Sequence, residues 1–218
     1  FKNHNFYNMP KKKHSFEYIK EKSKARAGSF YQRFELREGD CFPSPDGGWN
    51  DCENDRERFE FSSRPVQKPE GNKCYGYSLK LDESFEAVHP TNTDLGQVHQ
   101  KGGPKGSAGG FKSFPPLIQI GAKTNQLIFV WHMLTGNENN IQDTKIEFEL
   151  AKINEIKGNW TDISFCLDFE NKRMDAWLNG EKKVEYPNSP INFKPVSIYF
   201  KYGIYRSFVS RYKQKNGS

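Results

Sequence analysis

From about residue 29 onward, apolar and polar residues alternate with a period of two, the pattern of β-strands buried on one face. The alternation is clearest in six segments: 56–61, 75–81, 118–120, 163–169, 174–178 and 196–200. One of them leads into Asn179-Gly180, the strongest two-residue signal for a β-hairpin. Helical periodicity is scarce, and only 143–157 mixes the two periods. We therefore predict an all-β protein: a β-jelly-roll sandwich of two curved antiparallel sheets with a concave groove.

Composition and charge limit the partners that this chain can bind. Its 218 residues fit one all-β domain, and no apolar run reaches the ~18 residues of a membrane span, so we predict no membrane insertion. The net charge of +6 favours an anionic partner, which could be a nucleic acid, an anionic glycan or an acidic lipid. No nucleic-acid-binding motif is present, so we predict no nucleic-acid partner.

The first 25 residues are polar and basic, with the run Lys11-Lys12-Lys13, and they lack the alternation of the rest. We predict that 1–25 is a basic N-terminal arm packing on a single domain at 26–218. We expect the protein to be a monomer.

The four cysteines are Cys41, Cys52, Cys74 and Cys166, and none forms a C-x-x-C pair, which argues against a zinc site. Cys41 and Cys52 flank a turn-rich segment that a disulfide could close. Such a bridge would indicate a secreted or periplasmic protein, whereas the alternative is four reduced, partly buried thiols.

Two short segments carry the chemistry. In Gln97-Val98-His99, the glutamine and the histidine are two residues apart on an expected strand, so both side chains project from one face while Val98 faces the core. A single histidine is more often structural than catalytic. No two histidines have the spacing of metal ligands, and we predict neither a metal site nor a cofactor.

The second segment is Tyr199-Phe200-Lys201-Tyr202-Gly203-Ile204-Tyr205. In a regular strand Lys201 and Tyr205 emerge on one face, with Gly203 leaving space between them. An aromatic-rich core strand would not explain Lys201 or Gly203.

These segments resemble sequence blocks of the jelly-roll polysaccharide lyases. Q-[IV]-H, Y-F-K-x-G-x-Y and an R-x-E-L-type strand occur in family 7 alginate lyases, and similar blocks occur in the heparin-lyase-I-like and glucuronan-lyase-like families. The third block here is Arg58-Phe59-Glu60-Phe61, whose distance before Gln97 suits the family. Arg33-Phe34-Glu35-Leu36-Arg37 matches the string better and stays a second candidate.

The resemblance implies a lyase that cleaves a uronic-acid polysaccharide by β-elimination, with alginate as first choice and glucuronan or another glucuronate glycan next. His99 would be the general base at C5, and Tyr205 the acid for the leaving O4, or the base for the opposite C5 configuration. Arg58 and Gln97 would offset the carboxylate charge. Further contacts to the substrate are expected from Lys201, Arg33, Arg56 and Tyr199.

Two other functions stay open from the sequence. Glu53-Asn54-Asp55-Arg56-Glu57 has the E-x-D-x-E spacing of jelly-roll glycoside hydrolases, but the strand parity turns Glu57 away from Arg58. A non-catalytic glycan-binding module could use the same fold. The glycine-rich segment 101–110 follows His99 and could be a lid or a plain connection.

Overall fold

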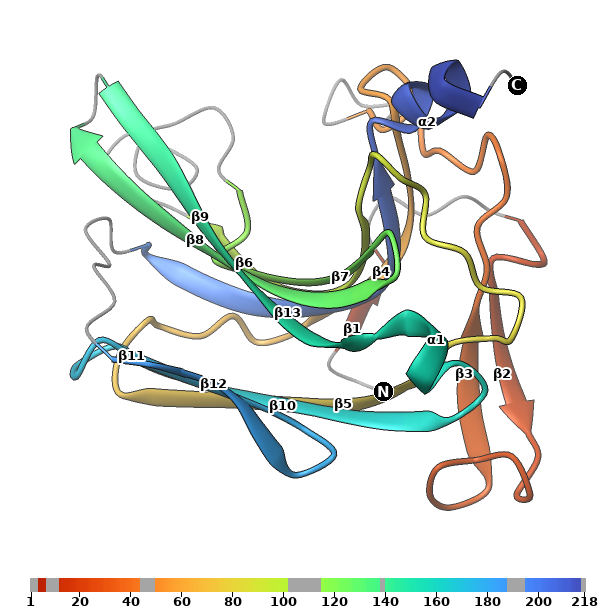
Figure 1. Cartoon of the computed structure of the whole chain (residues 1–218), viewed down its shortest axis with the longest axis horizontal. Helices are drawn as coiled ribbons and strands as arrows, with labels where there is room; N and C mark the ends of the chain where they lie inside the picture. Colours follow the sequence, from red (N-terminus) through yellow and green to blue (C-terminus); the bar gives the residue numbers. More distant parts are fainter. Residues whose placement is uncertain are drawn as a thin grey trace.

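The computed structural model describes residues 4–6, 12–43, 50–101, 115–137, 140–187 and 195–216, and the statements below concern these residues. Strands dominate, and the two helices are short: α1 (Ile153–Ile156) and α2 (Val209–Asn216). The fold is an antiparallel β-sandwich of the jelly-roll type, as predicted, and its sheets are not closed into a barrel (Figure 1).

The larger sheet contains seven antiparallel strands in the order β1-β4-β13-β6-β7-β8-β9. Their bounds are β1 (His4–Phe6), β4 (Arg56–Ser63), β13 (Ser197–Ser207), β6 (Thr93–Lys101), β7 (Ile118–Lys123), β8 (Gln126–Asn137) and β9 (Asn140–Lys152). Because β13 pairs with β4 on one side and β6 on the other, three segments that are distant in the sequence become neighbours. The segment with mixed periodicity holds most of β9 and all of α1.

The smaller sheet has four strands in the order β12-β11-β10-β5, and it lies against one face of the larger sheet (Figure 1). Its strands are β12 (Glu181–Tyr186), β11 (Arg173–Leu178), β10 (Trp160–Asp168) and β5 (Asn72–Lys80). Burial alternates along β11 residue by residue, as the period-two pattern predicted.

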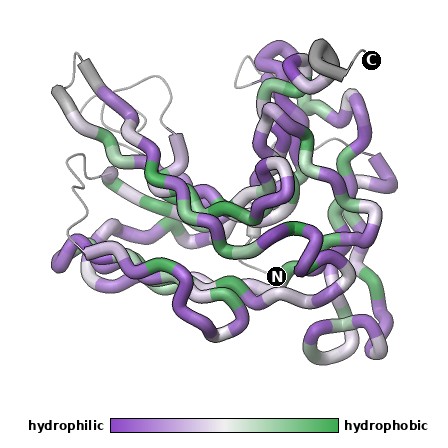
Figure 2. The backbone as a smooth tube through the Cα atoms, viewed as in Figure 1, coloured by the Kyte–Doolittle hydropathy of each residue, from purple (hydrophilic) through white to green (hydrophobic). Residues whose placement is uncertain are grey.

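The main core lies between these two sheets. The larger sheet contributes buried residues such as Val98, Ile120 and Phe129, and the smaller sheet contributes residues such as Phe165 and Met174. Figure 2 shows hydrophobic and hydrophilic residues alternating along the strands that form it. Each fully buried side chain of this size contributes about 1.5–3 kcal/mol relative to exposure, so the core fixes which face of β6 and β13 points outward.

A second, aromatic cluster joins the β2–β3 hairpin to the inner side of β4. The hairpin consists of β2 (Phe16–Lys20) and β3 (Phe30–Phe34). The Phe16 ring lies 5.5 Å from that of Phe59 and 4.9 Å from that of Phe61. Residues 16–20 of the predicted basic arm are therefore a strand in contact with the sandwich, whereas the boundary after residue 25 stays a prediction.

A bulge bends β13 in the middle of the second sequence segment. The pairing of β13 with β4 is regular, but the pairing with β6 shifts between Tyr202 and Tyr205. Gly203 lies there with φ +139°, and a Cβ at this position would collide with the carbonyl oxygen of Phe59. Bulges bend the strand that carries them, and Figure 1 shows β13 turning upward along its second half.

The four cysteines of the described residues form two disulfides, and none of them is free. The Cys41–Cys52 bridge is present, as one of the two alternatives predicted. The Cys74–Cys166 bridge links residues that are directly paired across β5 and β10. By the chain-entropy relation, the first contributes about 3 kcal/mol, and the second, whose cysteines are 92 positions apart, contributes about 4–5 kcal/mol. Among the described residues, no helix is long and apolar enough to cross a membrane.

Candidate active site

The predicted site residues of β4, β6 and β13 share one face of the larger sheet, the face turned away from the smaller sheet. In the pairing register, Lys201 lies opposite Gln97, Tyr199 opposite His99, and Tyr205 opposite Arg58. Directly opposed residues point to the same side of a sheet. Three segments of the sequence therefore deliver their polar side chains to one surface.

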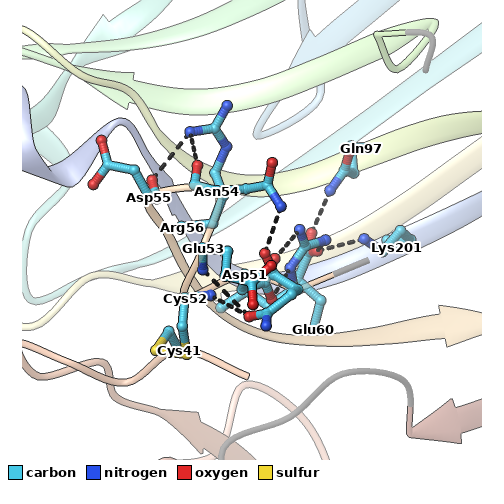
Figure 3. A network of polar contacts seen from close by, with 12 residues as sticks. Cys41, Asp51, Cys52, Glu53, Asn54, Asp55, Arg56, Glu60, Gln97 and Lys201 are labelled. Atoms are coloured by element: carbon cyan, nitrogen blue, oxygen red, sulfur yellow. Dashed lines mark hydrogen bonds and ion pairs between the residues drawn. A yellow bond between two sulfur atoms is a disulfide. The ribbon is translucent and has the colours of Figure 1, made fainter. Parts of the chain in front are cut away.

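The buried carboxylate of Glu60 lies at the centre of this surface (Figure 3). The amide Nε2 of Gln97 donates to Glu60 Oε1 at 2.5 Å, and Lys201 Nζ donates to Glu60 Oε2 at 2.5 Å. Arg58 Nη1 lies 3.5 Å from the same Oε2. Glu60 thus positions Arg58, Gln97 and Lys201, the three residues that the sequence predicted to contact the substrate.

Arg58 is held on its other side by Asp51. Its Nε and Nη2 donate to the two carboxylate oxygens of Asp51 at 2.7 and 2.6 Å, a bidentate geometry that fixes the plane of the guanidinium. Asp51 is fully buried, its backbone N–H donates to Phe42, and it precedes Cys52. The Cys41–Cys52 bridge therefore closes the loop that carries the partner of Arg58.

The four charged side chains Asp51, Arg58, Glu60 and Lys201 carry two negative and two positive charges. Burial would raise the pKa of Glu60, but Lys201 and Arg58 outweigh it and the pKa is lowered, so the carboxylate stays ionised. Burial lowers the pKa of Lys201 although Glu60 opposes the shift. The cluster as a whole carries no net charge when all four are ionised.

His99 lies at one end of the cluster in the form that a base requires. Burial, followed by the charge of Lys201, lowers the pKa of His99 to about 4, so the imidazole is neutral at neutral pH. Its Nδ1 lies 3.0 Å from the backbone carbonyl oxygen of Gln100, and a ring that donates Nδ1–H to this oxygen keeps on Nε2 the lone pair that a base needs. The ring stacks on Tyr199 with the centroids 5.5 Å apart, which fixes its orientation.

Tyr205 lies at the other end, beyond the bulge. Burial raises the pKa of Tyr205 to about 12, although Arg58 opposes the shift, so the phenol keeps its proton at neutral pH. The Arg58 guanidinium carbon lies 4.3 Å from the centre of the Tyr205 ring. A neutral imidazole and a protonated phenol are the two forms needed for proton removal and proton delivery.

Arg33, the alternative arginine, lies elsewhere. It is on β3, where its guanidinium bonds Glu17 and Glu35. The hairpin packs against Phe59 and Phe61, on the face of β4 opposite to Arg58. The structure therefore brings Arg58, and not Arg33, to Gln97 and Lys201.

The hydrolase pair is not assembled either. Glu57 is buried on the face opposite to Arg58 and forms an ion pair with Arg206, and its Oε1 accepts the N–H of Gly39 at 2.7 Å. Glu53 is exposed in the turn before β4. The glycine-rich segment lies outside the described residues, except for Lys101 at the end of β6.

A second network on this face escaped the sequence analysis. Nδ1 of His132 lies 3.0 Å from Asp143 Oδ2, and its Nε2 lies 2.6 Å from Gln119 Oε1. The amide of Gln119 in turn donates to Asp94 at 2.8 Å. Burial, with a smaller effect of Glu60, raises the pKa of Asp94 to about 7. Asp94 lies opposite Tyr205 in the sheet, so the network reaches the candidate acid.

A family model described as "Polysaccharide lyase" matches residues 3–218, almost the whole chain. The chain belongs to this polysaccharide lyase family. It is therefore an enzyme of the lyase class that acts on polysaccharides, as the sequence blocks implied, and neither the hydrolase nor the non-catalytic module describes it.

Solved structures show the same fold in other polysaccharide lyases. The endo-β-1,4-glucuronan lyase of the fungus Trichoderma reesei is 17 % identical, with a TM-score of 0.68 over 97 % of this chain and 82 % of that one. The alginate lyase AlyC3 is 18 % identical, with a TM-score of 0.51 over 70 % and 65 %. The family 7 alginate lyase A1-II' is 15 % identical, with a TM-score of 0.51 over 75 % and 73 %. No curated protein gave a significant match by sequence.

Proposed function

We propose that this polysaccharide lyase cleaves a uronic-acid-containing polysaccharide by β-elimination and leaves a 4,5-unsaturated uronate. The observation that carries the proposal is the arrangement on the outer face of the larger sheet. A neutral histidine and a protonated tyrosine lie on either side of a hydrogen-bonded cluster that contains Arg58 and Gln97.

In the proposed reaction His99 removes the C5 proton, which is acidified by the neighbouring carboxylate. Tyr205 protonates O4 as the C4–O4 bond breaks, and the C4–C5 double bond forms. The raised pKa of Tyr205 suits the acid role better than the role of base for the opposite C5 configuration, because a phenolate is scarce at neutral pH.

The charge of the substrate carboxylate must be offset as the C5 carbanion develops. One N–H of the Gln97 amide goes to Glu60, and in the proposed complex the second donates to an oxygen of the substrate. Since the Arg58 cluster has no net charge, its contribution comes from N–H donors held in fixed directions rather than from excess positive charge. Glu60 and Asp51 act here as positioning residues.

The choice of substrate rests on two observations that point in different directions. The wording of the Gln97-Val98-His99 and Tyr199–Tyr205 blocks favours alginate. The glucuronan lyase matches a larger share of this chain, 97 %, than the alginate lyase AlyC3, 70 %, which supports a β-1,4-linked glucuronate polymer. We propose a polyuronide of one of these two kinds.

One assay tests the reaction and the substrate together. The protein is incubated with glucuronan, alginate and heparin-type polymers, and the ultraviolet absorbance of an unsaturated uronate is followed. A rise with one polymer is expected. New reducing ends without this absorbance would contradict β-elimination, and no cleavage of any uronate polymer would overturn the proposed substrate class.

We further propose that the protein is secreted or periplasmic, because its two disulfides are stable in an oxidising compartment. Mass analysis of the protein isolated from its source, with and without reduction, tests this. Free thiols in the isolated protein would contradict it.

A further inference from the structure

Beyond Tyr205, Arg56 on the same face of β4 and Arg211 on helix α2 contact one aromatic ring. Arg56 lies two residues before Arg58 on β4, so the two side chains share a face and are about 7 Å apart along the strand. Its partner in the pairing register is Ser207, at the end of β13. The next residue, Phe208, is 40 % exposed.

The guanidinium of Arg56 lies 3.8 Å from the centre of the Phe208 ring, and that of Arg211 lies 4.1 Å from it. Both guanidiniums therefore contact the same aromatic ring. The attraction of each cation to the ring offsets part of their mutual repulsion.

The geometry of this pair is fixed by Asp55. Its backbone carbonyl accepts the N–H of Phe208 at 2.9 Å, and its carboxylate accepts the N–H and the hydroxyl of Ser210 at 2.9 and 2.7 Å. Arg56 also donates through Nη1 to the backbone carbonyls of Asn54 and Asp55 at 2.7 and 3.0 Å. The two cations are therefore held by backbone and ring contacts, and the carboxylate of Asp55 bonds Ser210.

The charges of this pair are not compensated within the described residues. Six other arginines form ion pairs there: Arg26, Arg33, Arg37, Arg58, Arg173 and Arg206. Neither Arg56 nor Arg211 has a carboxylate within ion-pair distance in the same residues. Two positive charges without a counter-ion thus lie beside a catalytic cluster that sums to zero.

We propose that Arg56 and Arg211, both held against the ring of Phe208, form a subsite for carboxylates of the sugar units that extend past Tyr205. This inference rests on the proposed function and adds to it the location of a non-reacting part of the substrate. The subsite supplies the excess positive charge that the catalytic cluster lacks. Guanidiniums suit this role because their N–H groups match the geometry of a carboxylate.

The subsite is tested by binding, without turnover, in the His99→Ala background. Affinities for a uronate disaccharide and tetrasaccharide of the cleaved polymer are measured by calorimetry after adding Arg56→Gln, Arg211→Gln or both. Each single change is expected to weaken tetrasaccharide binding roughly threefold to fivefold, and the double change roughly tenfold, as for exposed charge pairs. The disaccharide, which need not reach the subsite, is expected to bind unchanged.

Arg173→Gln is the matched control, because it removes one positive charge from the outer face of the smaller sheet. An equal loss of affinity in this control would mean that net charge alone acts, and it would overturn the subsite. Unchanged tetrasaccharide affinity in the double variant would overturn it as well. If the His99→Ala protein binds no uronate oligomer at all, the proposed function fails together with the subsite.

Discussion

The outer faces of the two sheets each carry a four-membered charge cluster made of one Arg, one Lys, one Asp and one Glu. On the smaller sheet the members are Arg173, Lys182, Asp175 and Glu185, joined by ion pairs at 2.6 to 3.8 Å. On the larger sheet they are Arg58, Lys201, Asp51 and Glu60. The two clusters contain the same four residue types.

Burial separates the two clusters. Side chains of the first are 14–55 % exposed, whereas those of the second are 0–13 % exposed. Exposed ion pairs contribute about 0–1 kcal/mol each, but a buried charge that loses its partner costs about 3–5 kcal/mol. The charged side chains of the larger sheet are therefore held in fixed positions by their burial, whereas those of the smaller sheet are exposed to water.

The largest contrast is expected in catalysis. Because His99 and Tyr205 flank the buried cluster, His99→Ala and Tyr205→Phe should each lower kcat/KM by about 10²–10⁴-fold or abolish turnover. Arg173→Gln on the other sheet should leave it unchanged. Rates of unsaturated-uronate formation are the measurement, with circular dichroism to show that the fold persists; full activity in either variant would remove that residue from the mechanism.

The second contrast is in stability. Glu60→Gln leaves the buried ammonium of Lys201 without its counter-ion, so the free energy of unfolding should fall by about 3–5 kcal/mol. Glu185→Gln, in the exposed cluster, should change it by less than about 1 kcal/mol. Urea unfolding of both variants measures the difference, and equal effects would mean that burial does not distinguish the clusters.

The two disulfides differ in the same way, because Cys41–Cys52 lies near the buried cluster and Cys74–Cys166 lies on the smaller sheet. Replacing Cys74 and Cys166 with serine should lower the free energy of unfolding by about 2–5 kcal/mol with little change in kcat, because this bridge lies on the smaller sheet. Replacing Cys41 and Cys52 should cost less stability but lower kcat, because it loosens the loop that holds Asp51 against Arg58. The reverse pattern would contradict the positioning role of that loop.

The last contrast concerns pH. The pKa of Asp94 is raised to about 7 in the folded protein, so between about pH 4 and 7 the folded state binds one more proton than the unfolded state. The free energy of unfolding therefore falls as the pH rises through this range, and the contribution of Asp94 is lost once the pH passes 7. His99 acts oppositely: its lowered pKa of about 4 makes stability rise with pH up to about 6.5. The difference between wild type and Asp94→Asn isolates the first contribution.

That difference should favour the Asp94→Asn variant increasingly from pH 4 to 8, by an amount on the order of a few kcal/mol. Asp175, with a pKa lowered by the Arg173 hydrogen bond, should show the opposite sign: its stabilisation is lost only as the pH falls below about 4. Denaturant unfolding from about pH 2 to 8 measures both. A pH-independent difference for Asp94→Asn would show that this carboxyl is not protonated in the folded state.

Parts of the site could be predicted because they depend on local periodicity. Strand parity placed Arg58 and Glu60 on one face of β4 and the phenylalanines on the other, and it paired Gln97 with His99. These assignments succeed because a strand buried on one face fixes the direction of each alternate side chain.

The remainder depends on contacts that no local pattern encodes. Asp51 lies in a turn without periodicity, and only its position beside Cys52 hints at a fixed conformation. Gln119 and His132 meet because of the β7–β8 register, and Cys74 meets Cys166 because β5 pairs with β10 across 92 positions. Such pairings are selected by the whole core. Arg211 is on the short helix α2, so the strand alternation could not predict where its side chain lies.

Gly203 also bears on how substitutions would be tolerated along β13. Any side chain there would push against the backbone of Phe59 and Glu60, and so move β4 away from β13. Arg58 and Tyr205 are directly paired across that seam, so their separation would widen although neither residue had changed. Position 203 should therefore accept glycine almost alone in a saturation library. Variants at position 203 would lose activity like active-site mutants, because the absence of a side chain at Gly203 sets the distance between β4 and β13.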